Sequence, residues 1–249
     1  AKYPSDITSN SNLDINTFIN QPNNILGIEY IKALMRFNSK INPVPLKRLG
    51  AGYHSLDTGT KLASATGIRT AMANKDNISG LLPDNCLNII KNHTTIEYND
   101  FSTVLGSKLL SMDTLDHIEG INQDLSNRIA NNKYNFTDIE TFIPMLQSKN
   151  YTYSAISRAL LHIILDIKTD DIKEFVNNNY AMILGFTKKS GVLSEISKST
   201  KIPLVSKFAT FYKEADNNQR KMLDINLKAD NLYRMIYMNK TSEILPTEF

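Results

Sequence analysis

The chain has 249 residues, of which 41% are hydrophobic, so it can bury the core of one large domain or of two smaller ones. Its 28 Lys and Arg nearly balance its 25 Asp and Glu, so any contact with nucleic acid must come from a local basic patch. The single cysteine excludes an intramolecular disulfide and a cysteine-based metal cluster, and no apolar run approaches the ~18 residues of a membrane span. We therefore expect a cytoplasmic protein that spans no membrane and has no metal site of its own.

The first twenty residues are rich in Ser, Asn and Asp and do not begin with Met, which indicates a processed or trimmed polypeptide. Beyond them, apolar residues at helical spacing between Ile25 and Met35 predict a helix, with Asn23 or Asn24 as its N-cap. The prolines within Ile41–Leu49 favour an extended backbone and predict a short strand. A glycine-containing loop follows this strand.

A second helix is predicted from Ser64 to Met72, where small and hydroxylated residues open an amphipathic pattern. Helix, strand, loop and helix in this order form the closing half of a doubly wound α/β unit. We therefore assign residues 1–80 to an α/β remnant of a Rossmann-type domain. Residues 81–249 are assigned to a second, mainly helical domain.

Helical periodicity dominates the second domain. It predicts helices near residues 84–92, 99–111, 113–132, 136–148 and 152–168, a short helix after the cap at Thr169–Asp171, and a long helix from Asn217 to Met238. Between the last two, Ala181–Phe186 predicts a buried strand, Val192–Ser199 a helix and Pro203–Ser206 a second extended segment. Strand, helix and strand together predict a small α/β addition within the helical domain.

The start of the second predicted helix carries residue types that suit an anion. Ser64 and Thr66 offer hydroxyl groups beside the free backbone N–H groups of a helix N-terminus, and Arg69 lies one turn further on. An ordinary helix cap would use the same residues, so this segment alone leaves both interpretations open. Likewise, Arg48 and Leu49 end the predicted strand, where open α/β sheets bind ligands, and Asn23 can cap a helix or bond a ligand.

These segments together resemble one known family. Gln21–Leu34, Leu46–Arg48, Gly50–His54 and Leu62–Arg69, in this order, are similar to the bacterial tRNA(Met) cytidine acetate ligases, whose catalytic domain is nucleotidyltransferase-like. Glu119–Gly120 with Arg128, and Lys149–Ser154 with Arg158, resemble the helical half of these ligases. The resemblance is close over residues 20–72 and fair over 113–168.

The resemblance implies an enzyme that activates acetate with ATP as acetyl-adenylate, Mg²⁺ accompanying the phosphates, and then acetylates N4 of the wobble cytidine in elongator tRNA(Met). It also implies that specific residues bind ATP, namely Asn23, Arg48, Leu49, Ser64, Thr66 and Arg69. The family's first phosphate motif, a His-containing loop, is not among the residues of this chain. We therefore expect the isolated chain to be inactive in adenylation.

Basic and aromatic residues of the helical half predict a surface for tRNA. Its candidate residues are Arg128, Lys149, Tyr151 and Arg158, accompanied by Lys133, Tyr134 and Tyr153. The alternative is that Tyr151 or Tyr153 packs in the core and that the cations are merely solvated. Two other functions stay open: a non-catalytic RNA-binding module on the same scaffold, and a nucleotidyltransferase-like enzyme that acts on a small metabolite.

Overall fold

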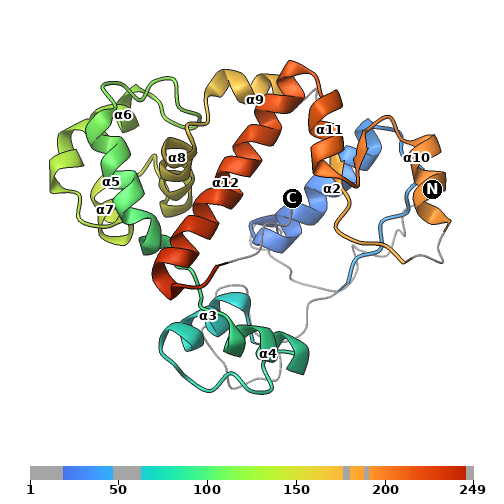
Figure 1. Ribbon diagram of the computed structural model, residues 1–249, viewed down its shortest axis with the longest axis horizontal. Helices are drawn as coiled ribbons and strands as arrows, with labels where there is room; N and C mark the ends of the chain where they lie inside the picture. The colour runs from blue at the N-terminus through green and yellow to red at the C-terminus, as the bar shows by residue number, and fades with distance from the viewer. Residues whose placement is uncertain (1–18, 47–62, 176–179, 188–190, 245–249) are drawn as a thin grey trace, which may run out of the picture. The chain divides into compact units, whose positions relative to one another are not determined.

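The computed structural model describes residues 19–46, 63–175, 180–187 and 191–244 (Figure 1). Contacts between residues divide the chain into two compact units, residues 1–93 and 94–249. Among the described residues, no helix is long and apolar enough to cross a membrane.

The first unit contains three described helices, α2 (Pro22–Arg36), α3 (Ala65–Ala73) and α4 (Asp84–Asn92). The predicted cap of α2 is wrong, because the helix begins at Pro22 with Gln21 as its N-cap, and Asn23 and Asn24 lie within the first turn. Proline is favoured at this first position because its missing N–H has no partner there in any helix. The prediction for α3 is confirmed, with Ser64 as N-cap.

The predicted strand at Ile41–Leu49 is described only up to Leu46, and these residues belong to no strand. A strand needs a neighbour for its backbone N–H and C=O groups. The described part of the first unit holds no strand that could be this neighbour.

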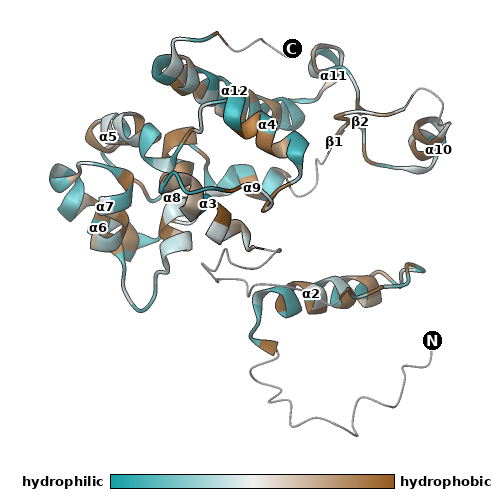
Figure 2. Cartoon of the chain, turned by 90° about the horizontal axis from the view of Figure 1, so that it is seen from below, coloured by the Kyte–Doolittle hydropathy of each residue, from teal (hydrophilic) through white to brown (hydrophobic). Residues whose placement is uncertain are grey.

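The second unit is built around a helical bundle. Its elements are η2 (Tyr98–Phe101), α5 (Ser102–Ser111), α6 (Gln123–Asn132), η3 (Lys133–Asn135), α7 (Ile139–Leu146), α8 (Tyr153–Leu165) and α9 (Thr169–Phe175). Leu105, Phe142, Leu160 and the other fully buried side chains of one core cluster come from these helices and from the turn before α6. Figure 2 shows hydrophilic and hydrophobic stretches side by side on these helices, as amphipathic helices have them.

The helix predicted over residues 113–132 is wrong in its first half. Residues 113–122 form turns and a loop, and α6 begins at Gln123, where the Asn122 side chain accepts a hydrogen bond from the Leu125 N–H at 3.0 Å. Gly120 has φ +79°, a conformation that a helix excludes. The loop is held to α8, because His162 Nδ1 lies 2.7 Å from the Glu119 carbonyl oxygen.

The predicted α/β addition is confirmed in outline. Strand β1 (Ala181–Met182) pairs in parallel with β2 (Leu204–Val205), and α10 (Val192–Ser199) connects them. The prediction that Ala181–Phe186 is a buried strand is wrong, because β1 has two residues and Leu184 is 96% exposed. A sheet of two strands has no second layer on one face, so little of it is buried.

Helix α12 (Asn217–Thr241), preceded by α11 (Phe208–Glu214), lies against α8 and α9 (Figure 1). At its carboxyl end, Lys240 Nζ is 2.7 Å from Asp100 Oδ2 of η2. Nearer its start, Asn226 bonds the hydroxyl group of Tyr180, which precedes β1. The ring of Tyr180 also contacts Phe211 of α11, with centroids 5.6 Å apart. Helix α12 therefore connects the bundle with the small sheet.

Candidate functional site

The start of α3 is the most completely described part of the predicted phosphate site. The Ser64 side chain is 1% exposed, and its Oγ accepts a hydrogen bond from the Gly67 N–H at 2.9 Å. The Ser64 carbonyl oxygen accepts the Ile68 N–H at 3.0 Å. Ser64 is therefore a buried helix cap, which fixes the direction in which the first turn points.

The first turn of α3 is electrostatically suited to an anion. The N–H groups of Ala65 and Thr66 precede the first intrahelical bond, and in the described structure neither donates to another residue. This turn contains no Asp or Glu that would compensate the positive end of the helix dipole. Two backbone donors and an uncompensated dipole can therefore bind a phosphate oxygen.

Thr66 and Arg69 complete this helix start. The Thr66 side chain is half-buried beside the two N–H groups, and Arg69 is exposed. Arg69 follows Ala65 by four residues, so both lie on one face of α3, and long helical side chains lean toward the helix N-terminus. The structure thus brings Ser64, Thr66 and Arg69 together within one turn and a half.

The other predicted ATP residues are placed differently. Asn23 is exposed in the first turn of α2, where its neighbour Asn24 bonds Gln21 through its side-chain amide at 3.4 Å. Arg48 and Leu49 lie outside the described residues. Of the predicted ATP residues, the structure therefore describes Asn23 in α2 and Ser64, Thr66 and Arg69 at the start of α3.

Two of the predicted RNA residues, Lys149 and Arg158, lie before and within α8. Thr152 caps this helix, and Lys149 and Arg158 are exposed. Neither of these two cations forms an ion pair with any described residue. They remain available to an external anion such as a phosphate of RNA.

The remaining two predicted RNA residues have internal partners. Arg128 Nε is 3.1 Å from Asp124 Oδ2, one turn earlier in α6. The ring of Tyr151 packs against the core cluster, and its hydroxyl group donates to Asn122 Oδ1 at 2.5 Å. Tyr151 therefore ties the loop before α8 to the cap of α6. Tyr153 and Tyr134 are exposed and can offer their rings to a base.

No group of three or more His, Cys, Asp or Glu side chains that could hold a metal ion occurs in the described ranges.

Burial raises the pKa of the Tyr98 hydroxyl, which donates to the Ser157 carbonyl oxygen within the bundle.

The model of the HIGH nucleotidyl transferase family matches residues 1–246. The chain belongs to this family. Among curated relatives, the tRNA(Met) cytidine acetate ligase of Thermoanaerobacter sp. (strain X514) is 31% identical over 239 residues, which cover 93% of this chain and 59% of the relative. The ligase of Caldanaerobacter subterraneus is 35% identical over 225 residues, covering 87% and 56%. The chain thus spans less than two thirds of the length of these relatives.

Two solved structures have the same fold. The apo form of Thermotoga maritima TmcAL matches with a TM-score of 0.77 at 24% identity, over 88% of this chain and 56% of the other. The form bound to alpha-thio ATP matches with a TM-score of 0.76 at 25% identity, over the same shares. These matches confirm a nucleotidyltransferase-like fold that is mostly helical here, and they confirm the resemblance to the tRNA(Met) cytidine acetate ligases.

Sequence reasoning missed one feature of this structure. A hollow of about 420 Å³ lies between α10 and the two short strands. The sequence offered only an aromatic residue, Phe186, at the end of the predicted strand, and serines spaced three apart on α10.

Proposed function

We propose that this chain forms part of an ATP-dependent tRNA-modifying ligase that acetylates N4 of the wobble cytidine in elongator tRNA(Met). The observation that carries the proposal is the helix start at Ser64–Arg69, which has two N–H groups, no acidic residue and a basic side chain on the face of Ala65. Membership in the HIGH nucleotidyl transferase family supports a nucleotide as the anion bound there.

The proposed chemistry has two steps. An oxygen of acetate attacks the α-phosphorus of ATP and pyrophosphate leaves, which gives acetyl-adenylate. The N4 amine of cytidine then attacks the acetyl carbonyl carbon, a proton is lost from nitrogen, and AMP leaves. The N–H groups of Ala65 and Thr66 and the Arg69 guanidinium would stabilise the negative charge of the phosphates. Mg²⁺ would accompany ATP by binding mainly to phosphate oxygens.

ATP binding tests the first half of this proposal. We expect Arg69→Ala to weaken ATP binding by about 10- to 150-fold, the range for one hydrogen bond to a charged group. The matched control is Arg36→Ala, which removes an exposed arginine from the last turn of α2 and should leave the affinity unchanged. Titration calorimetry at constant salt measures both. Equal affinity of the Arg69 variant and the unchanged chain would refute the phosphate site.

Acetylation tests the second half. In a complete assay with ATP, acetate and elongator tRNA(Met), N4-acetylcytidine is the expected product. A polypeptide limited to the 249 residues is expected to show no acetate-dependent exchange between ATP and pyrophosphate, because the family's first phosphate motif is not among them. Exchange by this polypeptide alone would contradict that expectation.

A further inference from the structure

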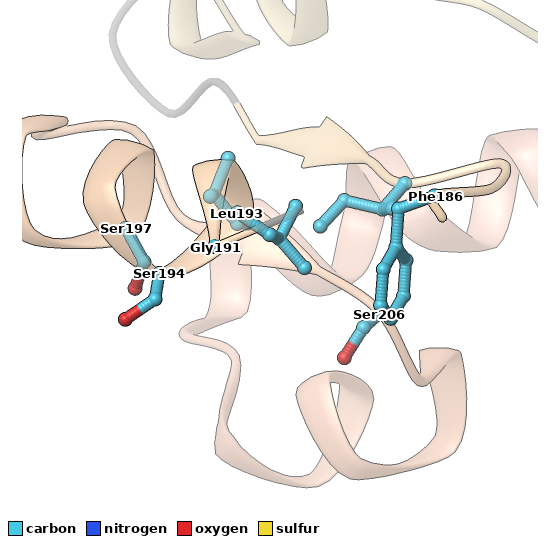
Figure 3. A pocket seen from close by; sticks show the side chains of 8 residues that line it. Phe186, Gly191, Leu193, Ser194, Ser197 and Ser206 are labelled. Atoms are coloured by element: carbon cyan, nitrogen blue, oxygen red, sulfur yellow. The ribbon is translucent and has the colours of Figure 1, made fainter. Parts of the chain in front are cut away.

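The hollow beside α10 lies at a place where parallel sheets bind ligands. Ile183 follows β1 and Ser206 follows β2, so both line the hollow from the carboxyl ends of parallel strands. Figure 3 shows Ser194 and Ser197 on α10 at one side and Phe186 and Ser206 at the other. The hollow has a volume of about 420 Å³ and is open to solvent.

The described residues that line the hollow are uncharged. No Asp, Glu, Lys or Arg is among the described lining residues, so none of these would neutralise a phosphate or a carboxylate. Ile183, Leu193 and Leu204 provide apolar walls. Phe186 is 59% exposed, so one face of an aromatic ring is presented to solvent. Such a ring can stack on a planar group.

Three hydroxyl groups complete the chemistry of the hollow. Ser194, Ser197 and Ser206 are exposed, and each hydroxyl group can donate one hydrogen bond and accept others. A ligand with flat apolar faces and a polar edge fits such walls. A nucleobase has this form.

Exposed lysines adjoin residues that line the hollow, since Lys198 follows Ser197 and Lys207 follows Ser206. Lys198 lies on α10, and Lys201 and Lys207 lie before and after β2. All three are exposed, and none forms an ion pair with the residues that the structure describes. Uncharged lining residues with lysines beside them suit an unstacked base whose flanking phosphates lie outside the hollow.

We propose that this hollow binds one unstacked base of a single-stranded segment of RNA. Phe186 stacks on the base, the hydroxyl groups of Ser194, Ser197 and Ser206 bond its edge, and the three lysines bind the neighbouring phosphates. The inference rests on the proposed tRNA substrate and adds a base-binding site to it. Because hydroxyl groups both donate and accept, the site is expected to tolerate different bases.

The test compares variants of the full chain in binding to a hairpin RNA with the sequence of the anticodon stem and loop of elongator tRNA(Met). We expect Phe186→Ala to weaken binding by about 5- to 150-fold, the loss typical of one aromatic stacking platform. Phe186→Tyr keeps a ring and should bind as the unchanged chain does. The matched control is Leu184→Ala, at a residue that is 96% exposed and does not line the hollow.

A second measurement follows the base directly. With 2-aminopurine at successive loop positions, one position should lose fluorescence on binding to the unchanged chain and keep it with Phe186→Ala. Hairpin binding that does not change with Phe186→Ala overturns this inference and leaves the proposed function intact. A hairpin that the unchanged chain does not bind at all overturns both. Equal dependence on Phe186 for a duplex without a loop also overturns the base site.

Discussion

The two unpaired cations at the start of α8 allow a quantitative prediction for RNA binding. Lys149 and Arg158 are exposed and have no ion-pair partner among the described residues, so neutralising them removes no internal interaction. If each binds one phosphate, the double variant Lys149→Gln, Arg158→Gln lowers by two the number of counterions that binding displaces. The slope of log K against log salt concentration should then become shallower by about 1.4 to 1.8.

The same relation gives the expected affinity. At about 0.1 M salt, each contact contributes about five- to eightfold, so the double variant should bind tRNA about 25- to 60-fold more weakly. The assay is a salt series of binding constants for elongator tRNA(Met). Lys32→Gln is the matched control, since Lys32 is exposed on α2 and already pairs with Glu29 at 2.6 Å. An unchanged salt slope in the double variant, with both variants folded, would refute the assignment of these cations to phosphates.

Three predictions concern stability. Ser64→Ala removes a buried cap and should lower the free energy of unfolding of the first unit by about 1 to 2 kcal/mol in urea titrations. Leu160→Ala should cost about 2 to 5 kcal/mol, because this side chain is fully buried, whereas Leu110→Ala at an exposed position should cost little. Asp100→Asn removes the charge that Lys240 contacts and should lower the melting temperature at neutral pH. The difference in melting temperature between this variant and the unchanged chain should disappear in acid.

The pH dependence of the last variant follows from the Asp100 carboxyl group. Burial would raise its pKa, but the hydrogen bond and charge of Lys240 and the Glu97 N–H outweigh burial and lower the pKa. A carboxyl group with a lowered pKa stabilises the fold above its unfolded pKa of about 4 and loses this effect as pH falls through the folded value. Melting curves from neutral pH to about pH 2 measure this. A deficit that persists in acid would contradict the ion-pair explanation.

The sequence predicted those helices whose caps and apolar faces are local. Ser64 and Thr152 precede α3 and α8. The sequence could indicate these helix starts because an N-cap bonds a backbone N–H only three residues further on. The first half of the helix predicted at 113–132 is wrong because its apolar residues are spaced as in a helix, although Leu115 and Ile118 are buried from an irregular loop. That loop is fixed by the positive φ of Gly120 and by the contact between His162 and the Glu119 carbonyl oxygen. These two residues are 43 positions apart in the sequence.

The candidate sites divide in the same way. The helix start at α3, where we propose a phosphate site, could be predicted because its cap and N–H donors lie within one turn. The hollow could not, because β1, α10 and β2 bring together residues between 183 and 206 that share no local pattern. For Tyr151 the sequence left stacking and packing equally open. Its contact with the core cluster supports packing.

Helix α12 also sets a rule for changes of length. Asn226 bonds the residue before β1, and Leu232 packs against the bundle core, so both attachments sit on one rigid helix. One residue inserted between them would turn one attachment by about 100° relative to the other, whereas seven residues, nearly two full turns, would restore the angle to within about 20°. Because each residue also lengthens the helix by about 1.5 Å, seven residues would move the two attachments about 10 Å further apart. We therefore expect this part of α12 to tolerate substitutions but not insertions.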